Sequence, residues 1–167
     1  MIILTVPEER YLKSYTQAYD VYAALGISTY GMTDPRSCDI FEKYENYRLE
    51  RNLKPDRVGS DYYWLVDEDR DYFIGEITIR HRLNDLLNLR GGHIGYVIRS
   101  NEWGRGYGTL MLKLALEKAK ACGLDKVLIT CNDENLASAR VMEKNGCVLE
   151  NIIKVEGQTV RRYWRQL

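Results

Sequence analysis

The chain has 167 residues and a formal net charge of zero, with 24 basic and 24 acidic side chains. This balance argues against electrostatic binding to nucleic acid or to an anionic membrane. The length and the hydrophobic fraction of 45% are typical of one globular domain with one core. The apolar start MIILTV is broken at once by PEER, which predicts a first strand and neither a signal peptide nor a membrane span. We therefore expect a single cytoplasmic domain over residues 1–167.

The cysteines and histidines show no metal-binding pattern. Neither of the two histidines, His81 and His93, stands at ligand spacing from a cysteine, and no C-x-x-C occurs. We expect no metal and predict reduced thiols in a reducing compartment. The alternative is a nucleophilic thiol, for which Cys131 at the end of an apolar strand is the best candidate. The four cysteines are Cys38, Cys122, Cys131 and Cys147.

The N-terminal third predicts a strand followed by two helices. The run IILTV favours a strand over 2–6, and aromatic side chains then recur at helical spacing over 12–22. Gly26 is a helix stop signal. We expect a loop over 27–36 and a second helix over 39–52.

The middle of the chain predicts an antiparallel hairpin and a further strand. YYWLV at 62–66 and YFIGEITIR at 72–80 flank the charged turn DEDRD. We expect a loop over 81–92, HRLNDLLNLRGG, and a strand over 93–99, HIGYVIR.

The C-terminal part predicts two helices and three strands. A helix over 105–122 should turn four side chains inward, namely Leu110, Met111, Leu114 and Ala115. KVLITC at 126–131 is nearly all apolar, as in a strand that is covered on both faces. A shorter helix over 135–145 and the strands 147–153 and 159–165 complete the order. This order predicts a mixed α/β fold (α+β), without the regular alternation of a doubly wound sheet.

Three glycines stand where the helix over 105–122 should begin, in the stretch WGRGYGT at 103–109. Each glycine in an ordered segment costs about 1 kcal/mol relative to alanine. Bare backbone at a helix start lets an anion approach the unpaired N–H groups. The chain lacks the Lys-Ser or Lys-Thr of a P-loop, and G-x-G-x-x-G is not completed. The stretch predicts a site for a phosphate or pyrophosphate group.

The segment GHIGYVIRSNEWGRGYGTLMLKLALEKAKACGLDKVLITCNDENLASARVMEKNGCVLEN resembles the core of the GNAT N-acetyltransferase superfamily, bacterial small-substrate type. The motif of that superfamily, Gln/Arg-x-x-Gly-x-Gly/Ala, falls on residues 103–108. Trp103 occupies the position of the leading Gln or Arg, which is a departure from the pattern. The resemblance extends from Gly92 to the C-terminus, and more loosely over the preceding hairpin.

The resemblance implies a fold and a cofactor. It implies a GNAT-like, mostly antiparallel central sheet of about six to seven strands, with helices on both faces. The strands 93–99 and 126–131 would be a parallel pair that splays apart to admit acetyl-CoA as co-substrate, and residues 92–151 would form the acetyl-CoA-binding core. The cofactor-binding residues that it implies are Ile98, Gly104, Arg105, Gly106, Tyr107, Gly108, Thr109, Asn135 and Ser138. For Asn135, helix capping is an equal alternative.

Direct acetyl transfer needs a neutral amine, and an amine with a pKa of about 10.4 is almost entirely charged at pH 7. A general base is therefore useful. Glu76 lies in an apolar strand where burial can raise its pKa, and His93 begins the strand beside the cofactor. Either side chain can instead be structural. Tyr96 is a weaker candidate, as a proton donor. Met142 stands where many members of the superfamily have a tyrosine that acts as general acid.

The resemblance places the acceptor wall in the helices of residues 1–60, which hold seven of the thirteen tyrosines. We expect the acceptor to be a primary amine of a small molecule or peptide, with no nucleic-acid or membrane partner; the sequence is also compatible with a homodimer. Two alternatives stay open. One is a non-catalytic acyl-CoA-binding module, and the other is a nucleotide-phosphate-binding protein.

Overall fold

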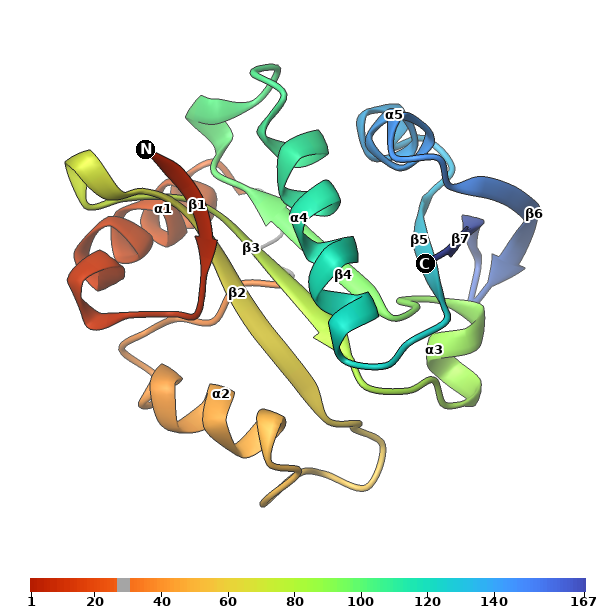
Figure 1. Cartoon of the computed structure of the whole chain (residues 1–167), viewed down its shortest axis with the longest axis horizontal. Coiled ribbons are helices and arrows are strands. Elements are labelled where there is room, and N and C mark those ends of the chain that lie inside the picture. Colours follow the sequence, from red (N-terminus) through yellow and green to blue (C-terminus); the bar gives the residue numbers. More distant parts are fainter. Residues whose placement is uncertain (27–30) are drawn as a thin grey trace.

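The computed structural model describes residues 1–26 and 31–167, and within them the chain forms one seven-stranded sheet with helices on both faces (Figure 1). The strands are β1 (Ile2–Thr5), β2 (Ser60–Asp67), β3 (Tyr72–Arg80), β4 (Ile94–Ile98), β5 (Lys126–Asn132), β6 (Val148–Val155) and β7 (Gln158–Gln166). The helices are α1 (Leu12–Ala24), α2 (Ile40–Arg48), α3 (Asp85–Leu89), α4 (Tyr107–Ala121) and α5 (Leu136–Lys144).

The strand order is β1-β2-β3-β4-β5-β7-β6, and every neighbouring pair is antiparallel except β4 and β5. The parallel pair has one register contact, between Ile94 and Ile129, and beyond it the two strands diverge (Figure 1). The mixed, mostly antiparallel sheet with a splayed parallel pair is confirmed.

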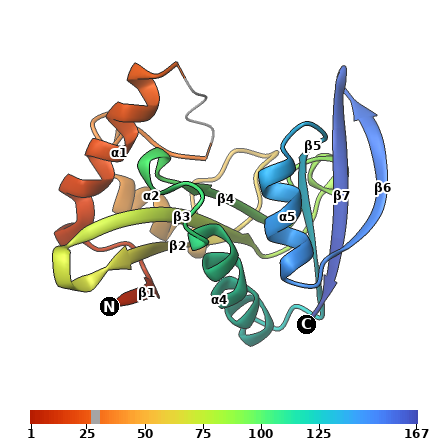
Figure 2. The same ribbon diagram turned by 90° about the horizontal axis from the view of Figure 1, so that it is seen from above.

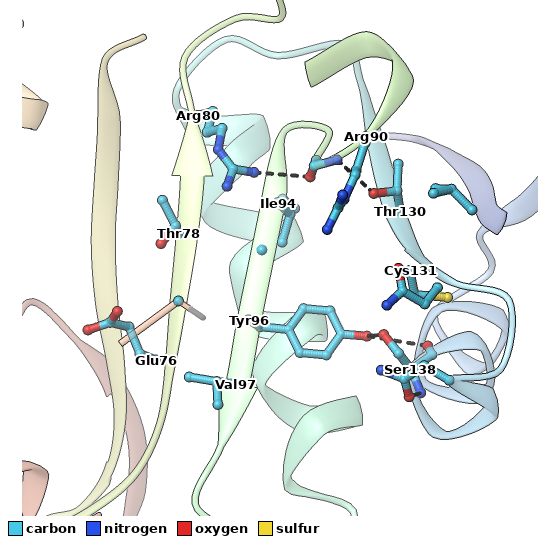
Figure 3. Close-up of a pocket in the computed structure, with 16 residues that line it drawn as sticks. Glu76, Thr78, Arg80, Arg90, Ile94, Tyr96, Val97, Thr130, Cys131 and Ser138 are labelled. Carbon is cyan, nitrogen blue, oxygen red and sulfur yellow. Dashed lines mark hydrogen bonds between the residues drawn. The ribbon is translucent and has the colours of Figure 1, made fainter. Parts of the chain in front are cut away.

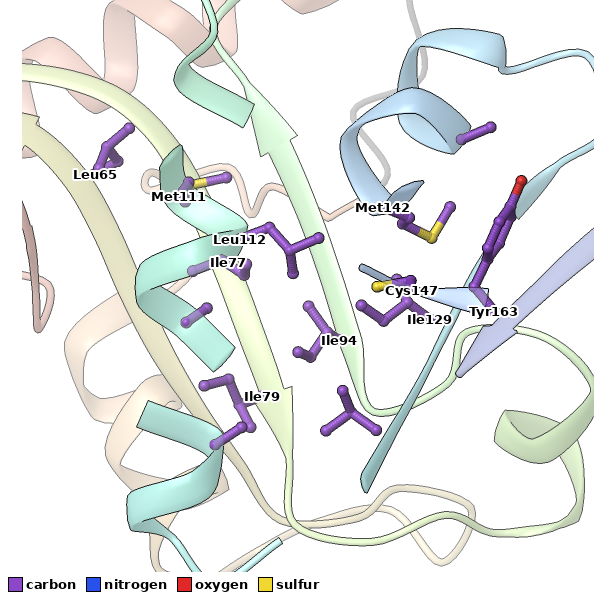
Figure 4. Close-up of a cluster of buried hydrophobic side chains, with 14 of the residues drawn as sticks. Leu65, Ile77, Ile79, Ile94, Met111, Leu112, Ile129, Met142, Cys147 and Tyr163 are labelled. Atoms are coloured by element: carbon purple, nitrogen blue, oxygen red, sulfur yellow. The ribbon is translucent and has the colours of Figure 1, made fainter. Parts of the chain in front are cut away.

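The sheet separates two cores of different composition. On one face α4 and α5 cover a cluster made mainly of aliphatic side chains and methionines, among them Ile77, Ile94, Met111 and Leu112 (Figure 4). On the other face α1 and α2 cover an aromatic cluster (Figure 2). The aromatic cluster consists of Tyr11, Tyr15, Ala18, Tyr22, Met32, Ile40, Tyr44, Trp64, Val66 and Phe73.

Two helical details differ from the expectations. The helix predicted over 105–122 begins at Tyr107, because Gly106 takes the left-handed φ of +83° and ends the preceding turn. Of the side chains predicted to face inward, Met111 and Ala115 are buried, but Leu110 is exposed and Leu112 is fully buried in its place. The buried residues Met111, Leu112, Ala115 and Ala119 follow helical spacing, so the stripe that faces the sheet is centred slightly later than predicted.

The segment predicted as a loop over 81–92 contains the short helix α3. Asn84 caps this helix by accepting a hydrogen bond from the Leu87 N–H at 2.9 Å. In the predicted loop 27–36, residues 27–30 lie outside the described residues. In the part of the chain that the structure describes, no helix is long and apolar enough to cross a membrane.

Candidate active site

The divergence of β4 and β5 opens a cavity of about 230 Å³ that passes between the two strands (Figure 3). Side chains from β3, β4, β5 and α5 surround it, together with the loop that follows α3. Its described lining consists of Gly31, Glu76, Thr78, Arg80, Arg90, Gly91, Ile94, Gly95, Tyr96, Val97, Thr130, Cys131, Asn132, Asn135, Ser138 and Val160.

The backbone of β4 presents polar groups to this opening. The Arg99 N–H donates to Ile74 O at 2.8 Å, so the backbone N–H and C=O groups of Arg99 point toward β3. Those of Val97, two residues earlier, point the same way. By alternation, the N–H and C=O groups of Tyr96 and Ile98 point to the other side, where β5 has diverged. The Ile98 carbonyl already accepts from Trp103 Nε1 at 2.8 Å and from the Tyr22 hydroxyl.

The three glycines around the start of α4 have two separate structural reasons. Gly104 and Gly106 have φ values of +77° and +83°, which favour glycine, and a Cβ at either position would meet no atom within 4 Å. Gly108 lies in the first turn of α4, where a Cβ would come within 3.2 Å of Val141 in α5. Gly106 caps the helix without a side-chain hydrogen bond, so no capping side chain stands between a ligand and the first N–H groups of α4. An unobstructed helix start of this kind suits an anionic group.

The remaining residues of this loop are partly engaged within the protein. Arg105 pairs with the buried Glu102, with Nη1 at 3.1 Å from Oε2. Tyr107 and Thr109 are half-buried in the first turn of α4, and the Thr109 carbonyl accepts from Asn145 Nδ2 at 3.2 Å. Arg105 is therefore paired but still exposed, and the glycines leave the backbone beside it uncovered.

The start of α5 faces the same cavity. Asn135 caps this helix, since its Oδ1 accepts from the Ser138 N–H at 3.1 Å. The Ser138 hydroxyl lies 2.7 Å from the Tyr96 hydroxyl, which also donates to Ser138 O at 3.3 Å (Figure 3). Burial raises the pKa of Tyr96, so the phenol keeps its proton at neutral pH. The two roles predicted for Asn135 are thus compatible, because it caps α5 and also lines the cavity.

Glu76 is a buried carboxylate on β3 that lines the cavity, with 2% of its surface exposed. Its Oε2 accepts from the Tyr44 hydroxyl at 2.6 Å and from Trp64 Nε1 at 2.7 Å. Its Oε1 has no hydrogen-bond partner among the described residues. Burial raises its pKa to about 7, against the opposing effect of the two hydrogen bonds. A carboxylate of this kind exchanges a proton readily near neutral pH.

His93 does not line the cavity, in contrast to the expectation that it acts there as a base. Its Nδ1 accepts from the Leu128 N–H at 2.9 Å, while its own backbone N–H donates to Leu128 O at 2.7 Å. Burial, and next the charge of Arg80, lower its pKa. A neutral imidazole that accepts from backbone is a structural clamp between β4 and β5.

Cys131 lines the cavity, but burial raises the pKa of its thiol to about 11. Because the thiolate is the reactive form, this environment disfavours a cysteine nucleophile. The described residues also contain no cluster of three or more His, Cys, Asp or Glu side chains that could hold a metal ion.

A family model for the acetyltransferase (GNAT) domain matches residues 15–148, which is most of the chain. The chain belongs to the GNAT acetyltransferase family. A curated relative, the uncharacterised N-acetyltransferase YnaD of Bacillus subtilis (strain 168), is 29% identical over 100 residues. This match covers 58% of the chain and 55% of the relative, so the chain spans about half the length of the curated protein that it matches.

Solved structures share the GNAT fold at low sequence identity. The ribosomal L7/L12 alpha-N-protein acetyltransferase RimL, in complex with coenzyme A, has a TM-score of 0.71 at 16% identity. That alignment covers 99% of this chain and 94% of RimL. The microcin C7 self-immunity acetyltransferase MccE, in complex with acetyl-CoA and AMP, has a TM-score of 0.72 at 14% identity, with 99% and 92% of the two chains covered. These likenesses establish the fold.

Two departures from the GNAT pattern now have a structural explanation. Trp103, at the position of the leading Gln or Arg, uses its indole N–H to bind the last carbonyl of β4 and packs edge-on against Tyr22 at 6.2 Å between ring centroids. Met142, at the position of the common tyrosine, is fully buried in the aliphatic core. Neither side chain reaches the cavity lining.

Sequence reasoning missed four side chains of the site. Tyr44 and Trp64 bind Glu76, but at the sequence level they are indistinguishable from ordinary core aromatics. Arg80 shares the face of Glu76, and the alternation Glu76-Thr78-Arg80 on one strand was a signal that could have revealed it. Arg90 comes from a loop and carries no such signal.

Proposed function

We propose that the protein is an acetyl-CoA-dependent N-acetyltransferase that moves an acetyl group to a primary amine by direct attack. The observation that carries the proposal is the Glu76 carboxylate. It is buried, has an unpartnered Oε1, has a pKa near neutrality, and lines the opening at the splayed strands. The GNAT family membership and the acetyl-CoA complexes among the structural neighbours support the same activity.

The residues present suit acetyl-CoA, which supplies the activated acetyl group as a thioester. In this proposal residues 92–151 hold it. The N–H groups at the start of α4, within the loop Gly104, Arg105, Gly106, Tyr107, Gly108 and Thr109, receive the pyrophosphate. The β4 backbone meets the pantetheine amides through the N–H groups of Tyr96 and Ile98 and the carbonyl of Tyr96, because the Ile98 carbonyl is occupied by Trp103 and Tyr22. Asn135 and Ser138 border the same path.

Glu76 acts as the general base in the proposed reaction. Its Oε1 accepts a proton from the ammonium group of the acceptor, directly or through one water, and leaves a neutral amine. Tyr44 and Trp64 hold Oε2 at hydrogen-bond distance, so the carboxylate keeps one orientation while it gains and loses the proton. A pKa of about 7 makes both protonation states accessible at neutral pH.

Tyr96 is the proposed proton donor for the departing thiolate. It is the phenol that projects into the opening, and its hydroxyl is positioned by Ser138 (Figure 3). Its raised pKa keeps the proton in place until charge develops on sulfur. In this proposal Tyr96 on β4 takes the role that the family pattern places at the position of Met142.

The acceptor amine enters from the face covered by α1 and α2, within residues 1–60. Gly31, in the segment between these helices, lines the cavity, as do Glu76 and Thr78 of β3. We propose that the acceptor is an amine of a small molecule or peptide.

The test combines binding with turnover. Acetyl-CoA should raise the melting temperature, because a ligand that binds the folded state stabilises it by mass action. Free thiol should then appear in the presence of a panel of primary amines. Stabilisation without thiol release from any amine would favour the non-catalytic acyl-CoA-binding module. The absence of any shift at millimolar acetyl-CoA would contradict acetyl-CoA binding altogether.

A further inference from the structure

Two guanidinium groups line the cavity near the point where β4 and β5 meet. Arg80, at the end of β3, donates from Nη1 to Gly91 O and Gly92 O, both at 3.0 Å. Its guanidinium lies against β4, since a Cβ at Gly95 would be 3.4 Å from Nη2. Arg90 extends from its loop into the gap between β4 and β5 (Figure 3). Both arginines are half-buried, so their charges are only partly screened.

The local charge at this end of the cavity is positive. Glu76 is the single acidic side chain among the described lining residues, and it is engaged by Tyr44 and Trp64. No described carboxylate forms an ion pair with Arg90. The charge of Arg80 also contributes to the lowered pKa of the neighbouring His93. An anionic group that enters here would meet the guanidinium of Arg90 and the positive charge of Arg80, whose Nη1 is bound to the carbonyls of Gly91 and Gly92.

The arginines and Glu76 lie along one path on the acceptor side. Glu76, Thr78 and Arg80 alternate on β3 and therefore point to the same face, the one covered by α1 and α2. Four residues of strand separate the Glu76 and Arg80 backbones by about 13 Å, at roughly 3.3 Å per residue. The distance between the Glu76 carboxylate and the guanidinium groups is shorter than this backbone separation, because the long arginine side chains can extend toward a ligand. A molecule with its amine at Glu76 would thus present its opposite end to the arginines.

We infer that the acceptor is an amine that also carries a carboxylate, which Arg80 and Arg90 bind at the closed end of the cavity. This inference rests on the proposed acetyl transfer and names its substrate class. A guanidinium fork matches a carboxylate with two parallel hydrogen bonds. A polyamine would place a second cation beside two guanidinium groups, where like charges repel. The span between Glu76 and Arg80 favours acceptors whose amine and carboxylate are several bonds apart.

The test uses three acceptors of equal length with acetyl-CoA, namely 6-aminohexanoate, 6-aminohexanamide and 1,6-diaminohexane. We expect kcat/KM for the carboxylate to exceed that for the amide and the diamine by about tenfold or more, the usual scale of a charge-assisted hydrogen bond. In Arg90→Gln this preference should fall several-fold, because only the charge of Arg80 remains. The melting-temperature shift with acetyl-CoA should be unchanged. Arg70→Gln is the matched control, since Arg70 is an exposed arginine paired with Asp67 at the other end of the hairpin.

Three results would overturn the inference. Equal use of all three acceptors by the wild-type protein would show that the arginines do not select the acceptor. A carboxylate preference that persists in Arg90→Gln, or that falls equally in Arg70→Gln, would place the selection elsewhere. If Arg90→Gln impairs turnover of succinyl-CoA with a neutral amine and leaves the acceptor preference intact, the anion site belongs to the acyl donor. Acetyl-CoA binding without transfer to any amine would instead contradict the proposed function.

Discussion

The two faces of the sheet are built from different side chains, and the difference assigns them different tasks. The face under α4 and α5 is mainly aliphatic, so it offers a ligand backbone groups at its edges and the hydroxyls of Tyr96 and Ser138. The face under α1 and α2 is aromatic. Its Tyr and Trp side chains combine large apolar bodies with polar tips, and two of these tips bind Glu76. An aromatic core can therefore hold a buried carboxylate that an aliphatic core could not satisfy.

The largest expected effect comes from removing the carboxylate on the aromatic face. Glu76→Gln keeps an oxygen for Tyr44 and Trp64 but cannot accept the amine proton. We expect turnover to fall by about 10²- to 10⁴-fold, the usual contribution of a general base. Acetyl-CoA binding, which we propose for the loop before α4 and the β4 backbone, should be nearly unchanged. Steady-state kinetics and a melting-temperature shift with acetyl-CoA measure the two effects separately.

The same variant has a stability signature with a defined sign. The folded pKa of Glu76, about 7, lies above its ordinary value of 4.5, so the native state holds a proton that the unfolded state releases. The stability contribution of this group is present below pH 4.5 and is lost as pH rises to about 7. Glu76→Gln should therefore be more stable than wild type at pH 8, by on the order of 3 kcal/mol. If Glu76→Gln has wild-type stability at pH 8 and wild-type turnover, Glu76 is not the general base.

The second effect concerns the backbone site at the end of the aliphatic face. Gly106→Val should weaken acetyl-CoA binding, because a branched side chain would occupy the open space before α4 and would oppose the φ of +83°. A partly buried helix N-terminus contributes up to about 2 kcal/mol, which corresponds to a loss of roughly 30-fold in affinity. Isothermal titration with coenzyme A measures this loss.

Two further variants separate the causes of that loss. Gly106→Asn tolerates a left-handed φ and so tests the side chain without the backbone strain. Arg105→Ala removes a charge that is already paired with Glu102, and should weaken binding less than either Gly106 variant. Coenzyme A affinity like wild type in both Gly106 variants would mean that this loop is only a turn. If Arg105→Ala loses more coenzyme A affinity than the Gly106 variants, the Arg105 side chain binds the phosphate more strongly than the backbone does.

A smaller effect should follow from removing one polar tip of the aromatic face. In the wild-type protein the hydrogen bond from the Tyr44 hydroxyl to Glu76 Oε2 lowers the pKa of Glu76. Tyr44→Phe deletes this hydrogen bond. The pKa should rise in the variant, so the activity limb in the pH profile of kcat/KM should move to higher pH. Tyr62→Phe is the control, since its ring stacks on Tyr44 with centroids 4.4 Å apart. An equal movement of the limb in both variants would attribute the effect to packing.

The smallest effect concerns the clamp between the two halves of the sheet. His93 must be neutral to accept from the Leu128 N–H, and its folded pKa is below the ordinary 6.5. The unfolded chain therefore binds a proton more readily, and wild-type stability should decline as pH falls below about 6.5. His93→Asn retains an acceptor atom without titrating in this range. Urea unfolding at pH 7.5 and 5.5 should show a smaller decline for this variant, whereas equal declines would contradict the clamp.

Much of the fold was predictable from the sequence, because periodicity and glycine punctuation reflect local physics. The seven strands, and the helices apart from α3, were expected near their observed positions. The failures have physical causes. The sequence placed Leu110 in the buried stripe of α4 instead of Leu112, because both are leucines next to Met111 and only packing against the sheet distinguishes them. The short helix α3 has too few residues for a periodic signal, and only its cap at Asn84 marked it.

The candidate site was less predictable, because its parts meet through the tertiary fold. Glu76 stood out as one acid in an apolar strand, but the partners that orient it come from α2 and β2. His93 looked equally suitable as a base, and its bond to Leu128 depends on a strand that lies 35 residues further along the chain. Arg90 lies in the loop after α3, and the course of this loop brings its side chain to the cavity. No residue spacing in the sequence predicts that course.

The single register contact between β4 and β5 also has a consequence for how the sheet responds to a ligand. The sheet consists of two antiparallel ladders, β1-β2-β3-β4 and β5-β7-β6, joined at Ile94 and Ile129. An extended molecule with amide groups that lies along β4 would supply the missing rungs between these ladders. The ligand would then act as an additional strand, and hydrogen exchange at the Tyr96 and Ile98 amides should slow when it binds. Binding would complete the sheet that the chain leaves open.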